Sequence, residues 1–403
     1  MAITLTNSPL RGDFTAPPSK SVAHRLMIAA TLAGGSPEDV LIPGSPSQDL
    51  TVTATCLRAL KASATPVLDC GESGSTLRFL LPIAAALGKC AAFLGRGRLP
   101  ERPIGTLLEL LKSHGNIVAG NQLPLALAGR LQAGTFTLPG NISSQFITGL
   151  LFALPLLEAP SHLQLTTELE SADYVRLTLD ILKRFGVEIQ TNASLTEFVW
   201  PRLSRYTLPN HLPLEVEGDW SNAAFFLAAG ALGGDGITAH GLNPASVQGD
   251  RAIAQLLERF GAIVTWADNA CTVKPGMLHA IPEIDVRAIP DLVPILAVVA
   301  GVAQGTTVFT NAARLRLKES DRLETTARLL RSVGGKAETT EDSLIVTGVD
   351  RYHGGTVDSC NDHRIAMAAA VAATRATGTV TLENPAAVAK SWPDFFTVCG
   401  TLR

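Results

Sequence analysis

The chain has 403 residues, with 33 lysines and arginines against 36 aspartates and glutamates, so its formal net charge is −3. Apolar residues make up 46% and charged residues 17%, and the mean hydropathy is +0.23. This composition excludes a disordered chain, which needs low hydropathy and high net charge. A charge near zero argues against a nucleic-acid partner held by bulk electrostatics. The length predicts two or three domains, or one large core divided in two.

No segment of the sequence predicts a membrane span. The longest apolar segments, 146–157, 223–234 and 292–303, are shorter than the roughly 18 residues that a spanning helix needs, and they predict buried helices instead. Residues 1–14 lack the basic start and apolar core of a signal peptide. The six cysteines are scattered, with none at metal-ligand spacing, which predicts reduced thiols, a cytoplasmic location and no metal site.

Six segments share one plan, in which a polar cluster is followed by a run rich in Ala and Leu and then by Gly or Pro. In chain order these segments are 19–34, 71–88, 143–160, 219–233, 290–305 and 361–378. Ser, Asp and Asn satisfy the free N–H groups of a first helical turn. A helix that is apolar on all sides is buried in a globular protein. The pattern therefore predicts six buried helices.

A second kind of helix is predicted between the buried ones, at 107–118, 177–189, 253–264 and 326–338. Leu and Ile at positions i, i+3 and i+4 form one apolar face, basic residues occupy the last turn, and Gly follows. Alternating segments at 135–138, 344–347 and 380–382 predict strands. The repeated unit is a buried helix, a strand, an amphipathic helix and further strands, about six times over. Six such units predict an α/β (α+β) fold, arranged as a solenoid or as two groups of three.

The polar clusters at the starts of the buried helices also hold the most concentrated Lys, Arg, Ser and Asp residues of the chain. If these helices run side by side, their positive ends converge on one place. Helix N-termini gathered with basic side chains form an anion site. The sequence therefore predicts that the functional site lies at these clusters.

Each cluster also has an ordinary structural explanation. Residues 19–25 would serve equally as a solvated basic turn, and 71–78 is a glycine-rich turn that matches no known phosphate-binding loop. Lys318 and Arg322 are four residues apart, so a helix would place them on one face beside Glu319. A helix start stabilised by surface salt bridges would explain that spacing as well.

Seven motifs, taken in chain order, resemble those of the 5-enolpyruvylshikimate-3-phosphate synthase family: SKSVAHR, GESGSTLR, RPIG, SSQF, LKESDRL, NDHR and AKSWPDF. The resemblance covers essentially the whole chain. It implies two similar domains, each of three repeated helix/strand units with parallel buried helices walled by β-sheet. It further implies that residues 1–18 and 218–403 form one domain and 19–217 the other, with the active site in the cleft between them.

The resemblance implies an enzyme of the shikimate pathway, which leads to chorismate and the aromatic amino acids. The carboxyvinyl (enolpyruvyl) group of phosphoenolpyruvate passes to the 5-hydroxyl of shikimate 3-phosphate by addition–elimination through a tetrahedral intermediate, and phosphate leaves. The residues matched to shikimate 3-phosphate are Lys20, Ser21, Arg25, Ser143, Ser144, Gln145, Ser171, Asp291 and Lys318. Those matched to phosphoenolpyruvate are Lys20, Gly74, Arg102, Gln145, Arg322, Arg364 and Lys390.

The reaction needs a base for the hydroxyl proton and an acid for the vinyl methylene, with reversed roles when phosphate leaves. We expect Asp291 to act as the base, Glu319 to exchange protons with the methylene carbon, and Lys20 to neutralise or protonate the departing phosphate. No metal or cofactor is expected, because cations and helix dipoles supply the electrostatics. The two substrates are the only expected partners, and the chain is expected to be a monomer.

Some positions depart from the family pattern. Glu72 and Ser75 stand where Asn and Thr are more common, and Arg314 stands where a smaller polar or acidic residue is usual. The SADY segment around Ser171 also differs from the commoner forms. His363 is expected to be a structural residue at a helix start. Glyphosate competes with phosphoenolpyruvate in this family, and the retained Gly74 predicts a sensitive enzyme.

Two alternatives remain. The sister family, UDP-N-acetylglucosamine 1-carboxyvinyltransferase, typically carries a Cys in the loop before its RPI-like element, and the matching loop 94–102 contains none. A non-catalytic protein that binds phosphorylated metabolites would keep the arginines but could lose the acid–base pair. Asp291, Glu319 and Lys20 are all present, which favours the enzyme.

Overall fold

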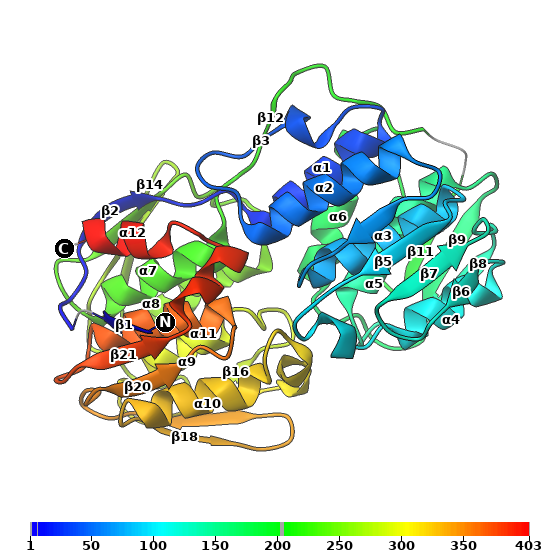
Figure 1. Ribbon diagram of the computed structural model, residues 1–403. Coiled ribbons are helices and arrows are strands. Elements are labelled where there is room, and N and C mark those ends of the chain that lie inside the picture. The colour runs from blue at the N-terminus through cyan, green and yellow to red at the C-terminus, as the bar shows by residue number, and fades with distance from the viewer. Residues whose placement is uncertain (1, 6, 202–204, 403) are drawn as a thin grey trace. The chain divides into compact units, whose positions relative to one another are not determined.

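The computed structural model describes residues 2–5, 7–201 and 205–402. Internal contacts divide these residues into two compact units (Figure 1). Unit 1 takes the described residues of Met1–Ser19, Pro43–Ser47 and Glu217–Arg403, and unit 2 takes those of Lys20–Ile42 and Gln48–Val216. Residues 43–47 group with unit 1, where the Ser45 hydroxyl donates a hydrogen bond to Asp394 Oδ1 (3.1 Å).

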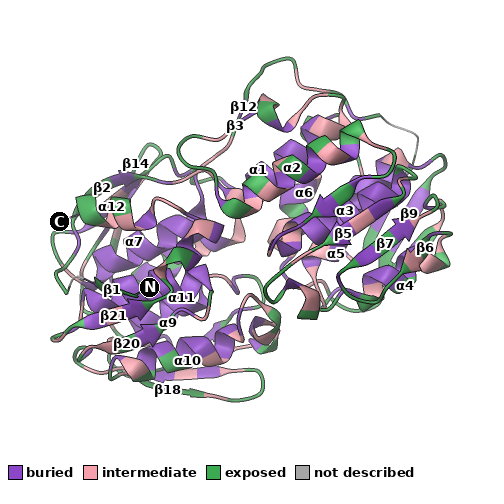
Figure 2. Ribbon diagram, viewed as in Figure 1, coloured by how far each residue is buried: buried purple, intermediate pink, exposed green. Residues whose placement is uncertain are grey.

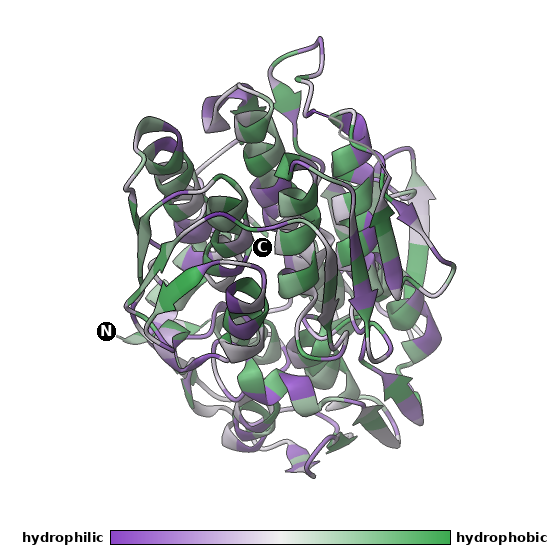
Figure 3. Cartoon of the chain, turned by 90° about the vertical axis from the view of Figure 1, so that its right-hand side faces the viewer, coloured by the Kyte–Doolittle hydropathy of each residue, from purple (hydrophilic) through white to green (hydrophobic). Residues whose placement is uncertain are grey.

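Six buried helices form the interiors of the two units. In unit 2 they are α1 (Lys20–Leu32), α3 (Gly74–Ala86) and α5 (Ser144–Ala153), and in unit 1 they are α7 (Trp220–Leu232), α9 (Val293–Ala300) and α11 (His363–Ala373). Every residue of α7 and α11 is buried, as the purple ribbons of Figure 2 show. Green, the colour of hydrophobic residues, covers much of the helical ribbon in Figure 3. The predicted buried helices are confirmed.

Polar side chains cap four of these helices as the sequence predicts, whereas α9 begins after Leu292, which makes no side-chain cap hydrogen bond. The capping residues whose side-chain oxygens accept a hydrogen bond from a backbone N–H of the first turn are Ser73, Ser143, Asp219 and Asp362. Each cap satisfies an N–H that the helix itself leaves without a partner. The apolar runs behind the caps supply the burial that keeps each helix in the interior.

The other helices carry one apolar face. They are α2 (Gln48–Ala62), α4 (Gly105–Ser113), α6 (Ala172–Arg184), α8 (Ala252–Phe260), α10 (Arg322–Ser332) and α12 (Phe395–Thr401). The four predicted amphipathic helices correspond to α4, α6, α8 and α10. Sequence reasoning missed α2, because no glycine follows Ala62 and its buried face includes Thr53 and Cys56.

Three sheets belong to unit 2. The first has the order β4 (Val67–Asp69), β5 (Ala91–Leu94), β7 (Leu125–Ala128) and β6 (Ile117–Ala119). The second has the order β8 (Thr135–Leu138), β9 (Ser161–Leu165), β11 (Glu197–Trp200) and β10 (Gln190–Thr191). The third is the parallel pair β3 (Val40–Leu41) and β12 (Leu214–Glu215).

Three sheets also belong to unit 1. The first has the order β2 (Gly12–Thr15), β13 (Ile237–His240), β15 (Ala270–Lys274) and β14 (Ile263–Ala267). The second has the order β16 (Glu283–Asp285), β17 (Thr306–Thr310), β19 (Leu344–Thr347) and β18 (Lys336–Thr339). The third is β20 (Gly355–Asp358), β21 (Val380–Glu383) and β1 (Ala2–Leu5).

One topology recurs in the four-stranded sheets. A parallel pair comes first, followed by two strands that pair antiparallel. In β4/β5, β8/β9, β16/β17 and β20/β21 the buried helix connects the two parallel strands, which is the βαβ unit. The repeat predicted from the sequence is therefore a real structural unit, and the predicted α/β class is confirmed. Among the described residues, no helix is both long and apolar enough to cross a bilayer.

The chain passes between the units at four points, and the unit 1 residues at the first and the last of them lie against each other. Pro18 and Gly218 form an antiparallel bridge. The Ser19 N–H donates to the Glu217 carbonyl (2.8 Å), and the Asp219 N–H donates to the Pro17 carbonyl (2.8 Å). We call residues 17–19 and 217–219 the crossings.

Candidate active site

A buried arginine of α1 ties this helix to α6 in unit 2. Arg25 on α1 donates from Nη1 to the Ser21 carbonyl (2.8 Å), from Nε to Thr178 Oγ1 on α6 (2.9 Å) and from Nη2 to the Tyr174 carbonyl (3.1 Å). Burial lowers the pKa of Arg25 to about 10, so the side chain remains charged at neutral pH. With a further bond from Nη2 to Thr148 Oγ1 on α5 (3.4 Å), Arg25 is a cation fixed by four contacts.

A hydroxyl network joins α1, α2 and α3 beside that arginine. Thr53 Oγ1 lies 2.8 Å from Nδ1 of His24 and 2.6 Å from Oγ1 of Thr76. Burial, with Lys20 and Arg25 acting in the same direction, holds the pKa of His24 well below its usual value. His24 is therefore neutral and serves the packing of the helix ends.

Lys20 is the first residue of α1, and its ammonium group lies 3.0 Å from Oδ2 of Asp49 on α2. Both side chains are 17% exposed, so the pair is reachable from solvent. Sequence reasoning missed Asp49, because the 29-residue separation of the two residues gives no local signal of their pairing.

The ends of α3 and α5 meet at Gln145. Its Oε1 accepts from Arg78 Nη1 (2.9 Å), and its Nε2 donates to Ser75 Oγ (3.0 Å). A Cβ on Gly74 would lie 2.5 Å from Arg78 Nη1 and 2.7 Å from Arg102 Nη1. The structure thus brings Gly74, Gln145 and Arg102 together as expected, and it adds Arg78. Arg78 follows Gly74 by four residues, a helical spacing that could have revealed it.

The remaining unit 2 candidates lie at helix starts. Ser143 caps α5, and its hydroxyl accepts from the Gln145 N–H at 3.3 Å, while Ser144 is the first residue of that helix. Ser171 precedes α6 with a left-handed φ of 55° and is buried. The carboxyl group of Glu72 lies against Gly97, since a Cβ there would be 2.6 Å from Oε2. We call the matched residues of unit 2 the unit 2 set: Lys20, Ser21, Arg25, Gly74, Arg102, Ser143, Ser144, Gln145 and Ser171.

Arg322 organises the site residues of unit 1. It is 1% exposed and binds Asp291 through Nη1 (2.6 Å), Glu319 through Nη2 (2.5 Å) and Asp362 through Nε (3.0 Å). Burial alone would lower the pKa of Arg322, but Asp362, Glu319 and Asp291 outweigh it and raise the pKa above its usual value. We call Asp291, Lys318, Glu319, Arg322, Asp362 and Arg364 the Arg322 cluster.

Asp291 is surrounded by cations. Lys318 Nζ lies 3.5 Å from its Oδ1, and Arg364 Nη2 lies 3.6 Å from its Oδ2. Burial opposes ionisation of Asp291, yet Lys318, Arg364 and Arg322 hold its pKa well below the usual range. Burial lowers the pKa of Lys318, with Arg322 and Arg314 acting in the same direction, while Asp291 opposes the shift. Arg314, one of the unusual positions, therefore lies within electrostatic reach of Lys318.

One local expectation is wrong. Lys318 and Arg322 do not share a helix, because η5 (Ala313–Leu317) ends before Lys318 and α10 begins at Arg322. Asp321 caps α10 by accepting from the Glu324 N–H (3.1 Å), and this cap starts the helix later than the i, i+4 spacing suggests. The two cations nevertheless meet at Asp291.

The other basic candidates of unit 1 are held by backbone carbonyls. Arg364 Nη1 donates to the Ser221 carbonyl on α7 (2.9 Å), and Lys390 Nζ donates to the Asn361 carbonyl (2.7 Å). Both side chains are buried. His363, the buried first residue of α11, lies 3.9 Å from Oδ1 of Asp362. The starts of α7 and α11, together with Asp291 just before α9, thus come together in unit 1.

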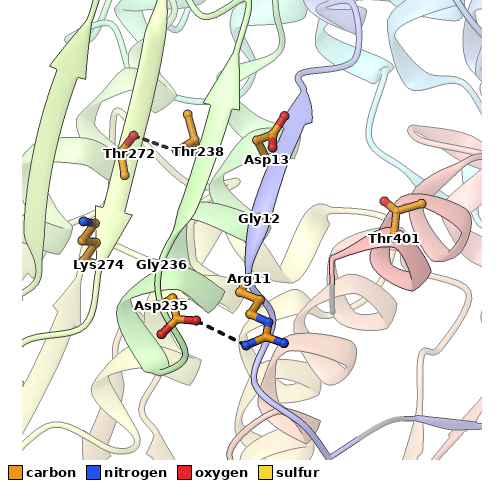
Figure 4. A pocket seen from close by; sticks show the side chains of 9 residues that line it. All are labelled: Arg11, Gly12, Asp13, Asp235, Gly236, Thr238, Thr272, Lys274 and Thr401. Atoms are coloured by element: carbon orange, nitrogen blue, oxygen red, sulfur yellow. Dashed lines mark hydrogen bonds and ion pairs between the residues drawn. The ribbon is translucent and has the colours of Figure 1, made fainter.

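The part of the chain that the structure describes contains no group of three or more His, Cys, Asp or Glu residues suited to a metal. A separate depression of about 560 Å³ in unit 1 lies over β2, β13 and β15 (Figure 4). Its Arg11 is paired with Asp235 (3.3 Å), and Thr238 is hydrogen-bonded to Thr272 (2.8 Å). The paired charges make this depression a poor anion site, in contrast to the Arg322 cluster and the unit 2 set.

Comparisons with known proteins agree on one family. The family model for EPSP synthase (3-phosphoshikimate 1-carboxyvinyltransferase) matches residues 5–399. The 3-phosphoshikimate 1-carboxyvinyltransferases of Clostridium kluyveri and Clostridium acetobutylicum are 40% and 41% identical, over 98% and 96% of this chain and 95% and 94% of theirs.

Solved structures share the fold. An EPSP synthase from Acinetobacter baumannii aligns with a TM-score of 0.79 at 24% identity, covering 100% of this chain and 98% of that one. An enolpyruvyl transferase from Streptomyces tendae aligns with a TM-score of 0.74 at 17% identity, covering 100% and 97%.

Proposed function

The chain belongs to the EPSP synthase family, and we propose that the unit 2 set and the Arg322 cluster together hold its two substrates. The enzyme transfers the carboxyvinyl group of phosphoenolpyruvate to the 5-hydroxyl of shikimate 3-phosphate and releases phosphate. The sequence left two alternatives, a UDP-N-acetylglucosamine 1-carboxyvinyltransferase and a non-catalytic binding protein. Neither is favoured, because the relatives of about 40% identity are named 3-phosphoshikimate 1-carboxyvinyltransferase.

Shikimate 3-phosphate is proposed to bind Lys20, Ser21, Arg25, Ser143, Ser144, Gln145, Ser171, Asp291 and Lys318. The support comes from fixed charge, because Arg25 is buried, charged and held by four hydrogen bonds. A phosphate gains most from cations and hydroxyls that do not reorganise on binding. The hydroxyls at the start of α5 add donors at a helix N-terminus.

Phosphoenolpyruvate is proposed to bind Lys20, Gly74, Arg102, Gln145, Arg322, Arg364 and Lys390, and Arg78 joins this set. Arg78 lies beside Gly74 and is oriented by Gln145. Arginine forks bind carboxylates and phosphates through paired hydrogen bonds, so two arginines beside a glycine suit a small dianion.

The proton transfers are assigned to Asp291 and Glu319, and the Arg322 cluster is the observation that carries this assignment. Both carboxylates bind one guanidinium. In the free chain, the cations around Asp291 hold its pKa well below the usual range, so it is a weak base. Anionic substrates would draw Lys318 and Arg364 toward themselves, and Asp291 would then accept the hydroxyl proton more readily.

Glu319 is proposed to exchange the proton of the methylene carbon. Lys20, whose partly exposed side chain pairs with Asp49, is proposed to neutralise or protonate the departing phosphate. We also propose a cytoplasmic monomer, with the scattered cysteines supporting the location. A phosphate-release assay with phosphoenolpyruvate tests the function. Release should require shikimate 3-phosphate, and release with a UDP-sugar in its place would overturn it.

We expect shikimate 3-phosphate to close the two units about the crossings, because the proposed ligands are divided between the units. Closure would exclude water from the reaction. Small-angle scattering should show a smaller radius of gyration when shikimate 3-phosphate and glyphosate are added. An unchanged radius with both ligands saturating would contradict closure.

Gly74→Ala is expected to raise both the KM for phosphoenolpyruvate and the Ki of glyphosate by about tenfold or more. The added methyl would press on the ends of Arg78 and Arg102, and weakening one charge-assisted hydrogen bond costs about 1.5–3 kcal/mol. Gly105→Ala is the matched control, because a Cβ at Gly105 has no atom within 4 Å among the described residues. Equal inhibition of wild type and Gly74→Ala by glyphosate would show that space at this position does not control binding.

A further inference from the structure

The hydroxyl of Thr53 lies where three helices of unit 2 meet. Its oxygen is 2.8 Å from Nδ1 of His24 on α1, 2.6 Å from Oγ1 of Thr76 on α3 and 3.0 Å from the carbonyl oxygen of Asp49 on its own helix, α2. Thr53 and Thr76 are fully buried, and His24 is 1% exposed. A buried hydroxyl costs free energy unless it is hydrogen-bonded, and this one has a partner on each of the three helices. We call Thr53, His24 and Thr76 the Thr53 junction.

These contacts exceed what α2 itself requires. A helical threonine commonly donates to the carbonyl four residues earlier. Thr55, on the exposed side of α2, does so with the Thr51 carbonyl (3.0 Å), and Thr53 does so with the Asp49 carbonyl. The other two contacts of Thr53 reach different helices, across 29 and 23 residues of sequence. Thr53 therefore joins α2 to α1 and α3 as well as bonding within its own helix.

The junction continues to the first residue of α3. Thr76 Oγ1 donates to Ser73 Oγ (2.8 Å), and Ser73 Oγ also accepts from the Thr76 N–H (3.2 Å), which caps the helix. Gly74 follows this cap directly. A Cβ on Gly74 would lie 2.5 Å from Arg78 Nη1 and 2.7 Å from Arg102 Nη1, so its backbone already lies close to both guanidinium groups. A small displacement of this helix start therefore changes the space beside the two arginines.

The junction also reaches the segment that carries Lys20. His24 lies one helical turn after Lys20 on the same face of α1. Asp49, whose carbonyl contacts Thr53, binds the Lys20 ammonium group through its own carboxylate at 3.0 Å. Thr53 is thus connected to Lys20 by two routes, one through each neighbouring helix.

Building on the proposed function, we propose that Thr53 is a positioning residue for the phosphoenolpyruvate site. It holds the starts of α1 and α3 in the arrangement that presents Lys20 and Gly74 to this substrate. Because its side chain is fully buried, it acts through Thr76 and Asp49 and not by touching the substrate. The contacts of Arg25 run instead to α5 and α6, so we expect the effect to fall on phosphoenolpyruvate. Thr53 lies outside the seven motifs.

The main test is Thr53→Val, which keeps the shape of the side chain and removes the hydroxyl. The KM for phosphoenolpyruvate at saturating shikimate 3-phosphate should rise by about five- to tenfold, because the buried partners lose a hydrogen bond and the helix starts shift. The KM for shikimate 3-phosphate should stay within about twofold. Thr53→Ser restores the oxygen and should return both values to near those of wild type. An unchanged KM for phosphoenolpyruvate in a folded Thr53→Val enzyme would overturn the proposal.

Two controls separate positioning from packing. Thr55→Val makes the same change on the exposed side of α2 and should leave both KM values unchanged. Leu60→Ala, near the other end of α2, removes a side chain that is 2% exposed, so it lowers stability without altering the Thr53 junction. If Leu60→Ala raised the KM for phosphoenolpyruvate as much as Thr53→Val does, lost stability would explain the effect and the proposal would fail.

Thr76→Val breaks the same junction from α3, and it keeps the proposal testable if Thr53→Val does not fold. It should raise the KM for phosphoenolpyruvate in the same way, and the two factors should not multiply in the double variant, because the two hydroxyls share one hydrogen bond. An unchanged KM in Thr76→Val, or factors that multiply, would contradict the proposal. Normal turnover of the wild type would then leave the proposed function standing, whereas a wild type that releases no phosphate with both substrates would reject the function itself.

Discussion

Replacing Arg322 by methionine is expected to abolish turnover and to lower the free energy of unfolding by about 3–5 kcal/mol. The buried guanidinium binds Asp291, Glu319 and Asp362 at once. Its removal leaves the three carboxylates close together with one cation fewer. Removing only one partner of a buried ion pair destabilises the fold by more than the intact pair stabilises it, because an uncompensated charge stays buried. Urea denaturation measures the stability, and phosphate release measures the turnover.

Arg331→Met is the matched control on the same helix. Arg331 binds Glu324, and both side chains are 44% exposed, so the loss should stay below about 1 kcal/mol with near-normal turnover. Arg322→Lys keeps the positive charge, but a lysine ammonium group lacks the planar set of donors with which the guanidinium binds three carboxylates. We therefore expect intermediate stability and low activity. Wild-type stability in Arg322→Met would show that the carboxylates do not depend on this cation.

Glu319→Gln is expected to lower kcat by about 10²- to 10⁴-fold while KM for either substrate stays within about threefold. The amide keeps the shape of the side chain but cannot carry the proton to and from the methylene carbon. A group that acts only at the barrier changes kcat, whereas a contact present before and during the reaction changes binding. Steady-state kinetics with both substrates varied separates the two cases.

The control for this variant is Glu324→Gln, a carboxylate on α10 that binds Arg331 at the surface. It should leave kcat unchanged. The Glu319 variant also loses an ion pair with Arg322, so its stability must be compared with wild type at the assay temperature. A stable Glu319→Gln enzyme with near-normal kcat would remove Glu319 from the proton transfer.

The helices were predictable because their signals are local. A cap, an apolar run and a closing glycine or proline lie close together in the sequence, and this pattern recurs in α3, α5, α7 and α11. The sheet partners were not predictable in this way. Ile237 pairs with Gly12 and Leu214 pairs with Val40, and no pattern in the intervening sequence specifies such distant partners.

The basic residues of the site were predictable from their motifs, but their partners were not. Asp49 meets Lys20, Arg78 meets Gln145, and Ser221 meets Arg364, each across a large sequence separation. Burial decides what such groups do, since it lowers the pKa of His24 and keeps this side chain neutral. Residue type alone predicts an ordinary imidazole at this position.

The pairing of β1 and β2 has a consequence for biosynthesis. Ala2 lies opposite Glu383 and Gly12 lies opposite Ile237, so both strands wait for partners that are translated much later. At about 5–20 residues per second, the delay is on the order of tens of seconds. Unit 2 is complete once Leu214 has joined Val40, long before β21 exists. We therefore expect the nascent chain to fold unit 2 first, and we expect β1 and β2 to stay unpaired, and accessible to chaperones or to neighbouring nascent chains, until unit 1 is complete.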